Sequence, residues 1–233
     1  MYVLGIDTST QICSIALYHK EKGIISETSQ KIDQNHSHTL LILVDQLLKN
    51  SEITPLQIEC IAVNSGPGSF TGLRIGMAFA KGLAHANNAH IKSANSLDIL
   101  ASQIPFSTLP ILALIDAKNS RVYGALYRYQ EGKLERKSEY FVGNLAAVLE
   151  RYKDLTCIAI GDACESYSDR IKNIIPKIYY IANSLNFLRA TALCELTLTY
   201  TEDHIETLEP FYLLKTQAEL QLEEKEEKKN EKN

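Results

Sequence analysis

The chain contains two copies of one short pattern, and an internal repeat constrains the fold more than any other feature of a sequence. Residues 4–25 align with residues 113–134 without a gap, so that Leu4-Gly5-Ile6-Asp7 falls on Ala113-Leu114-Ile115-Asp116. Each copy is an apolar strand that ends in aspartate, a short polar turn, and an alternating strand that runs to a glycine. The repeat predicts an α/β fold with two similar halves that face each other across a cleft.

The order of predicted elements is the same in both halves. A second repeat, Cys60-Ile61-Ala62-Val63 and Cys157-Ile158-Ala159-Ile160, marks a later strand in each. The hydrophobic periodicity predicts strands and helices in the following ranges. The first half has strands at 2–8, 11–20, 23–31 and 58–64, and helices at 37–50 and from Gly72 to about Ala86. The second half has strands at 110–116, 121–130, 134–142 and 157–161, and helices near 144–153, 163–173 and 186–200.

The stretch 104–110 contains two prolines and is the expected seam between the halves. We therefore predict one domain over residues 1–106 and a second over 107–218, with the last helix of the second domain packing back on the first. Residues 219–233 are a run of charges with nothing to bury. Such a tail is expected to be disordered or a solvated helix.

Composition excludes several classes of protein. The longest run of Leu, Ile and Val only is 40–44, far too short to span a membrane. The first residues, Met1–Asp7, contain no basic segment and no cleavage site, so we expect a cytoplasmic protein. Five cysteines without tight spacing indicate reduced thiols and no zinc site. A net charge of −4 indicates no overall basic surface for nucleic acid. If RNA is involved, we expect a partner to provide the basic surface.

Two loops have the character of phosphate-binding loops. The first is Asp7-Thr8-Ser9-Thr10, whose amides and hydroxyls suit phosphate oxygens and whose carboxylate suits a hydrated magnesium ion. The second, Gly66-Pro67-Gly68-Ser69-Phe70-Thr71-Gly72, lies between a strand and a helix, where glycines permit close backbone approach. No Lys-Ser or Lys-Thr pair follows its last glycine, so it is no P-loop. The simpler interpretation is a tight turn in which Ser69 or Thr71 caps the helix.

The second half lacks the counterpart that an ATP-binding clamp needs. Asp116 is followed by Ala117-Lys118-Asn119, which places a bulky lysine where close backbone approach is wanted. After the strand at 157–161 a single glycine, Gly161, stands in place of a glycine-rich adenosine loop. The loops around Asp7 and Gly68 are therefore interpreted as vestigial phosphate loops, and we expect no cofactor.

No catalytic or metal-binding set can be identified among the remaining residues. His36, His38, His85 and His90 include no pair four residues apart on one helix face, so we expect no metal site. The sequence has no G-x-S-x-G motif, and no cysteine lies in an electropositive neighbourhood. Helix capping or plain solvation is the expected role of the histidines.

The first long helix has more apolar surface than one buried stripe requires, and a helix that is apolar on two faces usually either lies deep in a core or meets a partner protein. The helix at 37–50 is apolar on two faces, since Ile42 and Leu43 extend the stripe formed by Leu40, Leu41, Val44, Leu47 and Leu48. The helix after Gly72 offers small and flexible residues that permit close helix approach.

Two segments together, Gly5-Ile6-Asp7-Thr8-Ser9 and the longer run 65–76, resemble the bacterial TsaB (YeaZ) family. The resemblance covers residues 1–130 well and the remainder by length and layout. It implies the duplicated ASKHA fold, the architecture of actin, heat-shock ATPases and sugar kinases. The catalytic relative TsaD carries a His-x-x-x-His metal pair, whereas this chain has Ala94-Asn95-Ser96-Leu97-Asp98 in that region.

The resemblance implies a role in making N6-threonylcarbamoyladenosine at position 37 of tRNA. The chain would be the non-catalytic partner that dimerises with a TsaD-like transferase, with a TsaE-like ATPase joining the pair, and it would meet tRNA only through the complex. In the family the two helices of the first half form the contact, with the same helices of TsaD or of another TsaB copy. The resemblance therefore implies an interface formed by Leu40, Leu43, Leu47, Leu73, Gly76, Met77, Ala80 and Ala84. One departure stands near the C-terminus, where family members carry an arginine and this chain has Leu214.

Two alternatives stay open at this point. The first is a small ATPase or kinase of the same fold that uses Asp7 and the two loops. The second is a peptidase, because this branch of the superfamily has carried a glycoprotease label. The second is the weaker of the two, since the sequence shows neither metal ligands nor a nucleophile.

Overall fold

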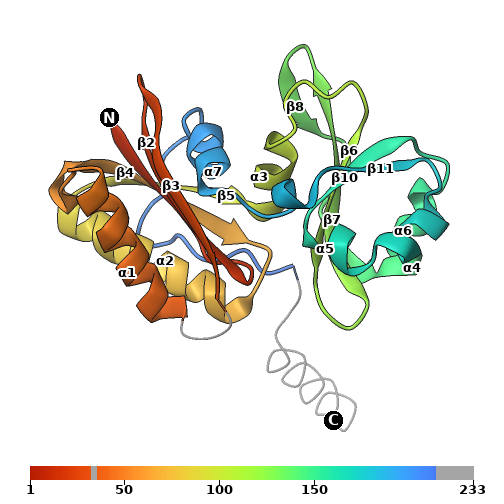
Figure 1. Ribbon diagram of the computed structural model, residues 1–233, viewed down its shortest axis with the longest axis horizontal. Helices are drawn as coiled ribbons and strands as arrows, with labels where there is room; N and C mark the ends of the chain where they lie inside the picture. The colour runs from red at the N-terminus through yellow and green to blue at the C-terminus, as the bar shows by residue number, and fades with distance from the viewer. Residues whose placement is uncertain (33–35, 214–233) are drawn as a thin grey trace, which may run out of the picture.

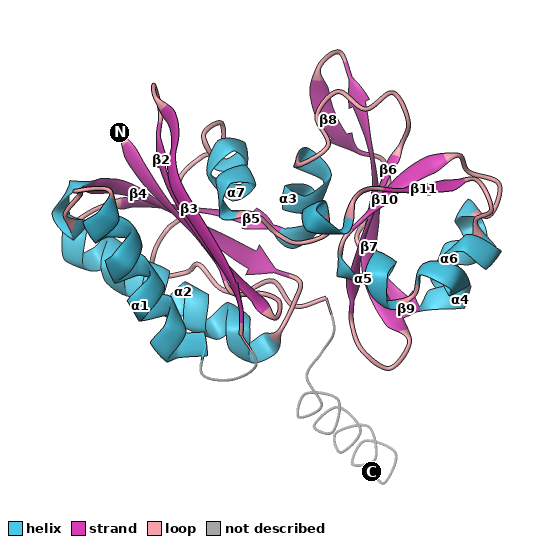
Figure 2. Ribbon diagram, viewed as in Figure 1, coloured by secondary structure: helices cyan, strands magenta, loops and turns pink. Residues whose placement is uncertain are grey.

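The computed structural model describes residues 1–32 and 36–213, which form two β-sheets with two helices between them (Figure 1). The helices of this central layer are α3 (Ser96–Ser102) and α7 (Ala190–Thr197). Further helices lie on the outer face of each sheet (Figure 2). Leu214 and the charged tail at 219–233 lie outside the described residues. In the described part of the chain, no helix combines the length and apolarity needed to cross a membrane.

The first sheet is built around β1, the strand that opens the repeat. Its order is β3-β2-β1-β4-β5, in which β1, β4 and β5 are parallel and the β1-β2 and β2-β3 pairs are antiparallel. Successive side chains of a strand point to opposite faces, so Val3 belongs to the central core and Leu4 to the outer one. The strands are β1 (Tyr2–Asp7), β2 (Ile12–His19), β3 (Gly23–Lys31), β4 (Ile58–Gly66) and β5 (His90–Asn95).

Helices α1 (His36–Asn50) and α2 (Phe70–Asn87) cover the outer face of the first sheet (Figure 1). Each helix buries one stripe with the 3.6-residue spacing of an amphipathic helix. On α1 the stripe contains Leu40, Val44 and Leu47, which are almost completely shielded from solvent. A short 3-10 helix, Pro55–Gln57, precedes β4.

The second sheet repeats this plan with smaller elements. Its order is β11-β10-β6-β7-β8, and β9 also pairs with β7. The strands are β6 (Ile111–Asp116), β7 (Arg121–Gln130), β8 (Lys133–Arg136), β9 (Phe141–Asn144), β10 (Cys157–Ile160) and β11 (Ile178–Tyr180). The helical elements are α4 (Leu145–Leu149), α5 (Asp162–Ser166), α6 (Ser168–Ile174) and the 3-10 turns Glu150–Tyr152 and Asn183–Leu185.

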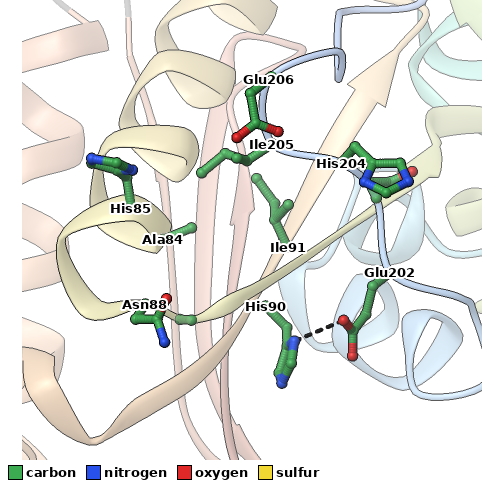
Figure 3. Close-up of a pocket in the computed structure, with 11 residues that line it drawn as sticks. Ala84, His85, Asn88, His90, Ile91, Glu202, His204, Ile205 and Glu206 are labelled. Carbon is green, nitrogen blue, oxygen red and sulfur yellow. Dashed lines mark ion pairs between the residues drawn. The ribbon is translucent and has the colours of Figure 1, made fainter.

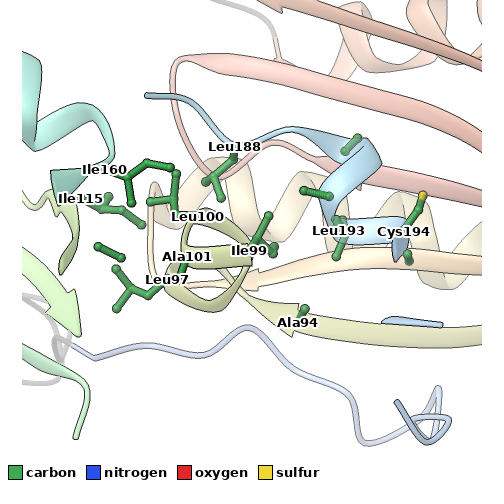
Figure 4. Close-up of a cluster of buried hydrophobic side chains, with 14 of the residues drawn as sticks. Ala94, Leu97, Ile99, Leu100, Ala101, Ile115, Ile160, Leu188, Leu193 and Cys194 are labelled. Carbon is green, nitrogen blue, oxygen red and sulfur yellow. The ribbon is translucent and has the colours of Figure 1, made fainter. Parts of the chain in front are cut away.

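The central layer joins the two halves through one apolar core. Side chains of α3, α7 and both sheets contribute to it, among them Leu100, Ile115, Ile160 and Leu193 (Figure 4). Gly5 lets α7 pack directly on β1, because a Cβ at this position would lie 2.6 Å from Cys194 Sγ. The halves are therefore held together by buried apolar surface as well as by the chain itself.

A carboxylate fixes the start of α7 on the first sheet. Glu27 of β3 accepts hydrogen bonds from the backbone nitrogen of Thr191 at 3.0 Å and from its hydroxyl at 2.8 Å. The same carboxylate pairs with the guanidinium of Arg189. A negative charge is favourable at the N-terminus of a helix.

After α7 the chain returns across the first half, and we call residues 198–213 the C-terminal strap. The backbone nitrogen of Asp203 donates to the carbonyl of Ile91 at 2.9 Å. The strap thereby covers the free edge of β5. Further along, Lys81 Nζ donates to the carbonyl of Leu208 at 3.0 Å. The backbone nitrogen of Phe211 then donates to the carbonyl of Ser65 at 2.7 Å, so the strap ends beside the Gly66–Gly72 loop.

Most expected elements are present, and several boundaries are wrong. The strand expected at 134–142 is divided into β8 and β9, because the ladder with β7 is interrupted at Lys137–Tyr140, where the backbone nitrogen of Leu126 donates to the Ser138 side chain at 3.0 Å. The helix expected at 186–200 spans only Ala190–Thr197, and that expected at 163–173 is two short helices. The prediction omitted β5, α3 and β11. The division into domains at 1–106 and 107–218 stays a prediction.

Candidate functional site

The turn at Asp7–Thr10 leaves the carboxyl end of β1 and folds back on itself. Asp7 Oδ1 accepts a hydrogen bond from the backbone nitrogen of Ser9 at 3.1 Å, a local contact that aspartate favours in turns. Thr8 and Ser9 are 2% and 1% exposed, whereas Thr10 lies at the rim and bonds to the backbone of Ile12. The turn is therefore closed to solvent, unlike a loop that receives a phosphate.

Glycines of the second loop and of α2 bring that segment into direct contact with the turn. A Cβ on Gly68 would lie 2.4 Å from the carbonyl oxygen of Ser9, and a Cβ on Gly72 only 2.0 Å from that of Thr8. A Cβ on Gly76 would lie 2.4 Å from Thr8 Oγ1. These separations are too short for real carbon atoms, so the contact requires glycine at each position.

Hydrogen bonds then lock the two loops together. Thr8 Oγ1 donates to the carbonyl of Gly72 at 2.7 Å, and the backbone nitrogen of Ser69 donates to the carbonyl of Ser9 at 2.6 Å. Ser69 Oγ accepts from the backbone nitrogen of Gly72 at 3.2 Å and so caps α2, while Thr71 is exposed. The simpler interpretation, a tight turn capped by Ser69, is what the structure shows, and groups that would hold a phosphate are used within the chain.

Asp7 is the centre of a small buried polar network. Asn64 Nδ2 donates to Asp7 Oδ1 at 2.7 Å and to Ser9 Oγ at 3.0 Å, and Ser96 Oγ donates to Asn64 Oδ1 at 2.9 Å. Sequence reasoning missed Asn64 and Ser96, although Asn64 is a polar residue at the end of the apolar run 60–63 and Ser96 directly precedes the apolar residues of α3. The network brings together β1, β4 and α3.

Burial dominates the electrostatics of Asp7. It raises the pKa of this carboxyl from 3.8 to about 6, although hydrogen bonds from Ser9 and Asn64 act in the opposite direction. The second oxygen, Oδ2, has no hydrogen-bond partner among residues 1–32 and 36–213. An ionised aspartate is therefore poorly accommodated at this position.

Replacing Asp7 by asparagine should stabilise the chain at neutral pH. Because the pKa of Asp7 is higher in the folded state, the folded state binds the proton more tightly between pH 4 and 6. Stability from this site is complete below about pH 4 and is lost as the pH rises to about 6. We expect Asp7→Asn to raise the free energy of unfolding by about 2 kcal/mol at pH 7.5 and to have little effect at pH 4. Urea unfolding of both proteins between pH 4 and 7.5 measures the difference in the free energy of unfolding. A difference that does not change with pH would contradict the prediction.

The equivalent carboxylate of the second half is neutralised by its own neighbour. Asp116 accepts from the backbone nitrogen of Lys118 at 2.8 Å, from Lys118 Nζ at 2.9 Å and from the hydroxyl of Tyr167 at 3.0 Å. Burial alone would raise the pKa of Asp116, but these hydrogen bonds outweigh it and lower that pKa. The ammonium group of Lys118 thus binds the carboxylate that a nucleotide site would leave free for a metal ion.

The turn that follows Asp116 is also tighter than its counterpart. Asp116 pairs with Val122 across β6 and β7, whereas Asp7 pairs with Ser14, so the second turn is one residue shorter. Lys118, Asn119 and Ser120 all have positive φ angles, of 61°, 53° and 58°. A left-handed run of three non-glycine residues is costly.

One cavity of about 310 Å³ lies between the end of α2, the start of β5 and the C-terminal strap (Figure 3). Its lining includes His85, His90, His204, Glu202 and Glu206. His90 Nδ1 lies 2.8 Å from Glu202 Oε2. Even so, across residues 1–32 and 36–213 no three His, Cys, Asp or Glu side chains are arranged to hold a metal ion.

The residues predicted for the partner interface lie inside the chain. All eight are buried, and they pack against the first sheet or against the turn at Thr8 because each occupies the inward stripe of its helix: Leu40, Leu43, Leu47, Leu73, Gly76, Met77, Ala80 and Ala84. A different set of residues faces solvent. On α1 these are Leu41 and Ile42, which are 55% and 40% exposed. On α2 they are Ala78 and Gly82, with Ile75 and Phe79 half-buried beside them.

Comparison with known proteins identifies relatives of this chain in sequence and in structure. The family model described as TsaD, tRNA N6-adenosine threonylcarbamoyltransferase, matches residues 8–172. The tRNA threonylcarbamoyladenosine biosynthesis protein TsaB of Bacillus subtilis is 33% identical over 177 residues, which cover 75% of this chain and 77% of the relative. The solved structure of YeaZ from Pseudomonas aeruginosa superimposes with a TM-score of 0.72 at 26% identity, covering 91% of this chain and 99% of that one.

A more distant structure shares the fold alone. The activator of the 2-hydroxyisocaproyl-CoA dehydratase from Clostridium difficile, solved with bound ADPNP, superimposes with a TM-score of 0.50 at 9% identity and covers 85% of this chain. The predicted duplicated ASKHA fold is confirmed by these neighbours together with the two sheets and their shared topology.

Proposed function

Because this chain belongs to the TsaB family, we propose that it serves tRNA threonylcarbamoyladenosine biosynthesis as a non-catalytic partner of a TsaD-type transferase. The relatives that match it carry this pathway in their names. TsaD-type transferases are themselves related to the chain, at 30% identity over 134 residues for one from Legionella pneumophila. Partners of one duplicated fold are suited to pairing through equivalent helices.

The observation that carries the non-catalytic assignment is the mutual closure of the two loops. The turn at Asp7 is filled by the backbone of Gly68 and Gly72, and the carboxylate of Asp7 is buried, with the residue only 1% exposed. In the second half, Lys118 neutralises Asp116. One half of the nucleotide clamp is thus filled by backbone and the carboxylate of the other is paired within the chain, which disfavours the alternative of a small ATPase or kinase.

The exposed side of the two outer helices is the surface that we assign to the partner. We call it the outer face, and it consists of Leu41, Ile42, Ile75, Ala78, Phe79 and Gly82. Leu41 and Ile42 place two large apolar side chains together in solvent. A Cβ on Gly82 would meet nothing within 4 Å, which leaves room for a helix of another protein. Exposed apolar patches of this kind mark interaction sites.

We assign three further properties to the same complex. A TsaE-like ATPase joins the pair, tRNA is bound only through the assembled complex, and two copies of this chain use the outer face when the transferase is absent. We place the complex in the cytoplasm, where the tRNA substrates are.

Replacing Leu41 by arginine should weaken the complex with the TsaD-type partner. An arginine at the centre of an apolar contact loses the buried leucine surface and must lose its own hydration. We expect the dissociation constant to rise at least about tenfold, and the melting temperature to change little because Leu41 is 55% exposed. Size-exclusion chromatography and calorimetry of the purified pair provide the measurements.

Leu56→Arg is the matched control, since Leu56 is 80% exposed and is not part of the outer face. It lies in the 3-10 turn Pro55–Gln57, which meets α2 at its last residue, where Asn87 Nδ2 donates to the carbonyl of Pro55 at 2.6 Å. The control variant should leave the dissociation constant unchanged. If the unaltered chain and its cognate transferase elute separately at micromolar concentrations, the proposed function is wrong. Equal weakening by both variants would contradict the assignment of the outer face.

A further inference from the structure

Aromatic side chains from three distant segments meet at the N-terminal end of α2. The ring centroids of Phe70 and Tyr212 are 5.1 Å apart, and those of Tyr140 and Phe211 are 5.6 Å apart. Phe70, Phe211 and Tyr212 are 38%, 38% and 36% exposed. With Arg74 these four aromatic residues form what we call the aromatic–arginine cluster. Large apolar side chains gathered on the surface need an explanation when the fold does not bury them.

The guanidinium of Arg74 is held in one orientation by this cluster. Its carbon lies 3.8 Å from the ring centroid of Phe70, and Nε donates to the hydroxyl of Tyr212 at 3.0 Å. The two terminal nitrogens make no hydrogen bond or ion pair with residues 1–32 and 36–213. A guanidinium that is already oriented and has free terminal nitrogens is suited to bind a carboxylate in bidentate geometry.

The strap makes the cluster a fixed feature of the surface. The backbone nitrogen of Phe211 donates to the carbonyl of Ser65. A Cβ on Gly66 would lie 2.8 Å from the carbonyl oxygen of Phe211, so the strap backbone rests directly on the glycine loop. Side chains that are ordered before binding cost less entropy when a partner arrives.

The geometry favours a protein occupant over RNA. Single-stranded RNA needs open aromatic faces for stacking and a basic surround. Here Arg74 covers one face of Phe70, and Arg136 lies 3.8 Å from the ring centroid of Tyr140. Glu209 precedes the strap end, and the whole chain has a net charge of −4. Partly exposed aromatic residues beside an arginine are the composition of protein–protein hot spots.

The cluster is also continuous with the outer face. Phe70 and Arg74 lie in the first turns of α2, the helix that carries Ala78 and Gly82 further along. We propose that the aromatic–arginine cluster is a second contact for the TsaD-type partner, and that it receives a segment in which a carboxylate binds Arg74 beside an apolar side chain on the exposed rings. This inference rests on the proposed function and adds the partner chemistry for one end of the interface.

The test is a calorimetric titration of the cognate transferase with the full-length chain and with two variants, Arg74→Ala and Tyr212→Ala. We expect each variant to raise the dissociation constant about tenfold or more, as truncation at a hot spot does. The effect of Arg74→Ala should be smaller at high salt, because it removes a charge pair. Phe106→Ala is the matched control: Phe106 is 75% exposed and stacks on Tyr129 elsewhere, with centroids 5.9 Å apart.

The control should change the dissociation constant by less than about twofold. If both cluster variants bind like the unaltered chain at unchanged melting temperature while Leu41→Arg still weakens the complex, only this inference is overturned. If they retain partner affinity but the complex loses affinity for tRNA, the cluster is an RNA contact and the inference is overturned as well. Failure of the unaltered chain to bind the transferase overturns both proposals.

Discussion

Replacing Gly72 by alanine should lower the free energy of unfolding by about 3 kcal/mol, at the upper end of the usual cost of overpacking. The new Cβ would lie 2.0 Å from the carbonyl oxygen of Thr8 and 3.2 Å from its carbonyl carbon. Both neighbours are backbone atoms, so no side chain can rotate away. Relief requires α2 to move off the turn, which would break the hydrogen bond from Thr8 Oγ1 to the carbonyl of Gly72.

The same helix provides the matched control. A Cβ added to Gly82 of α2 would meet nothing within 4 Å, so Gly82→Ala adds helix propensity without a clash. It should raise the free energy of unfolding by roughly 0.5–1 kcal/mol. Urea unfolding of both variants gives the comparison. A Gly72→Ala protein as stable as the unaltered chain would show that the two loops are not in contact.

Replacing Met77 by arginine should destabilise the fold by about 3–5 kcal/mol, the range for a buried charge without a partner. Met77 is 3% exposed and packs in the core between α2 and the first sheet. The sequence pattern assigned this residue to a partner contact, which would make its substitution a defect of assembly. The structure instead predicts a defect of folding, because the side chain points into the chain's own core.

Thermal unfolding of the isolated chain separates these two outcomes. Met77→Arg should lower the melting temperature by many degrees, whereas Leu41→Arg on the outer face should leave it nearly unchanged. A Met77→Arg variant with the melting temperature of the unaltered chain, whose only defect is in binding the transferase, would contradict the packing described for α2.

The internal repeat was sufficient to predict the two-sheet fold, because alternation and hydrophobic runs are strong along β1, β2 and β7. It was insufficient for β5, whose sequence His90–Asn95 has neither a long apolar run nor strict alternation. Such a strand is specified by its parallel pairing with β4, which a sequence pattern does not display. The contact between Glu27 and Arg189 depends likewise on tertiary structure that brings α7 back to β3.

The candidate site shows the same division. The motifs identified the Asp7 turn and the Gly66–Gly72 loop. They did not show that the loop fills the turn, because a glycine permits close approach of a phosphate and of a neighbouring backbone equally well. The apolar character of α1 was also clear in the sequence. Which of its leucines face inward was not, since Leu40 and Leu41 differ only in their angle around the helix axis. The fold buries the first and exposes the second.

Closure of the nucleotide site is the central claim, and calorimetric titration of Mg-ATP into the purified chain tests it most directly. Because the turn at Asp7 is filled by the glycine loop and Lys118 neutralises Asp116, we expect no measurable heat of binding for the chain alone. Micromolar affinity that Asp7→Ala abolishes would contradict the account and support the small ATPase or kinase instead.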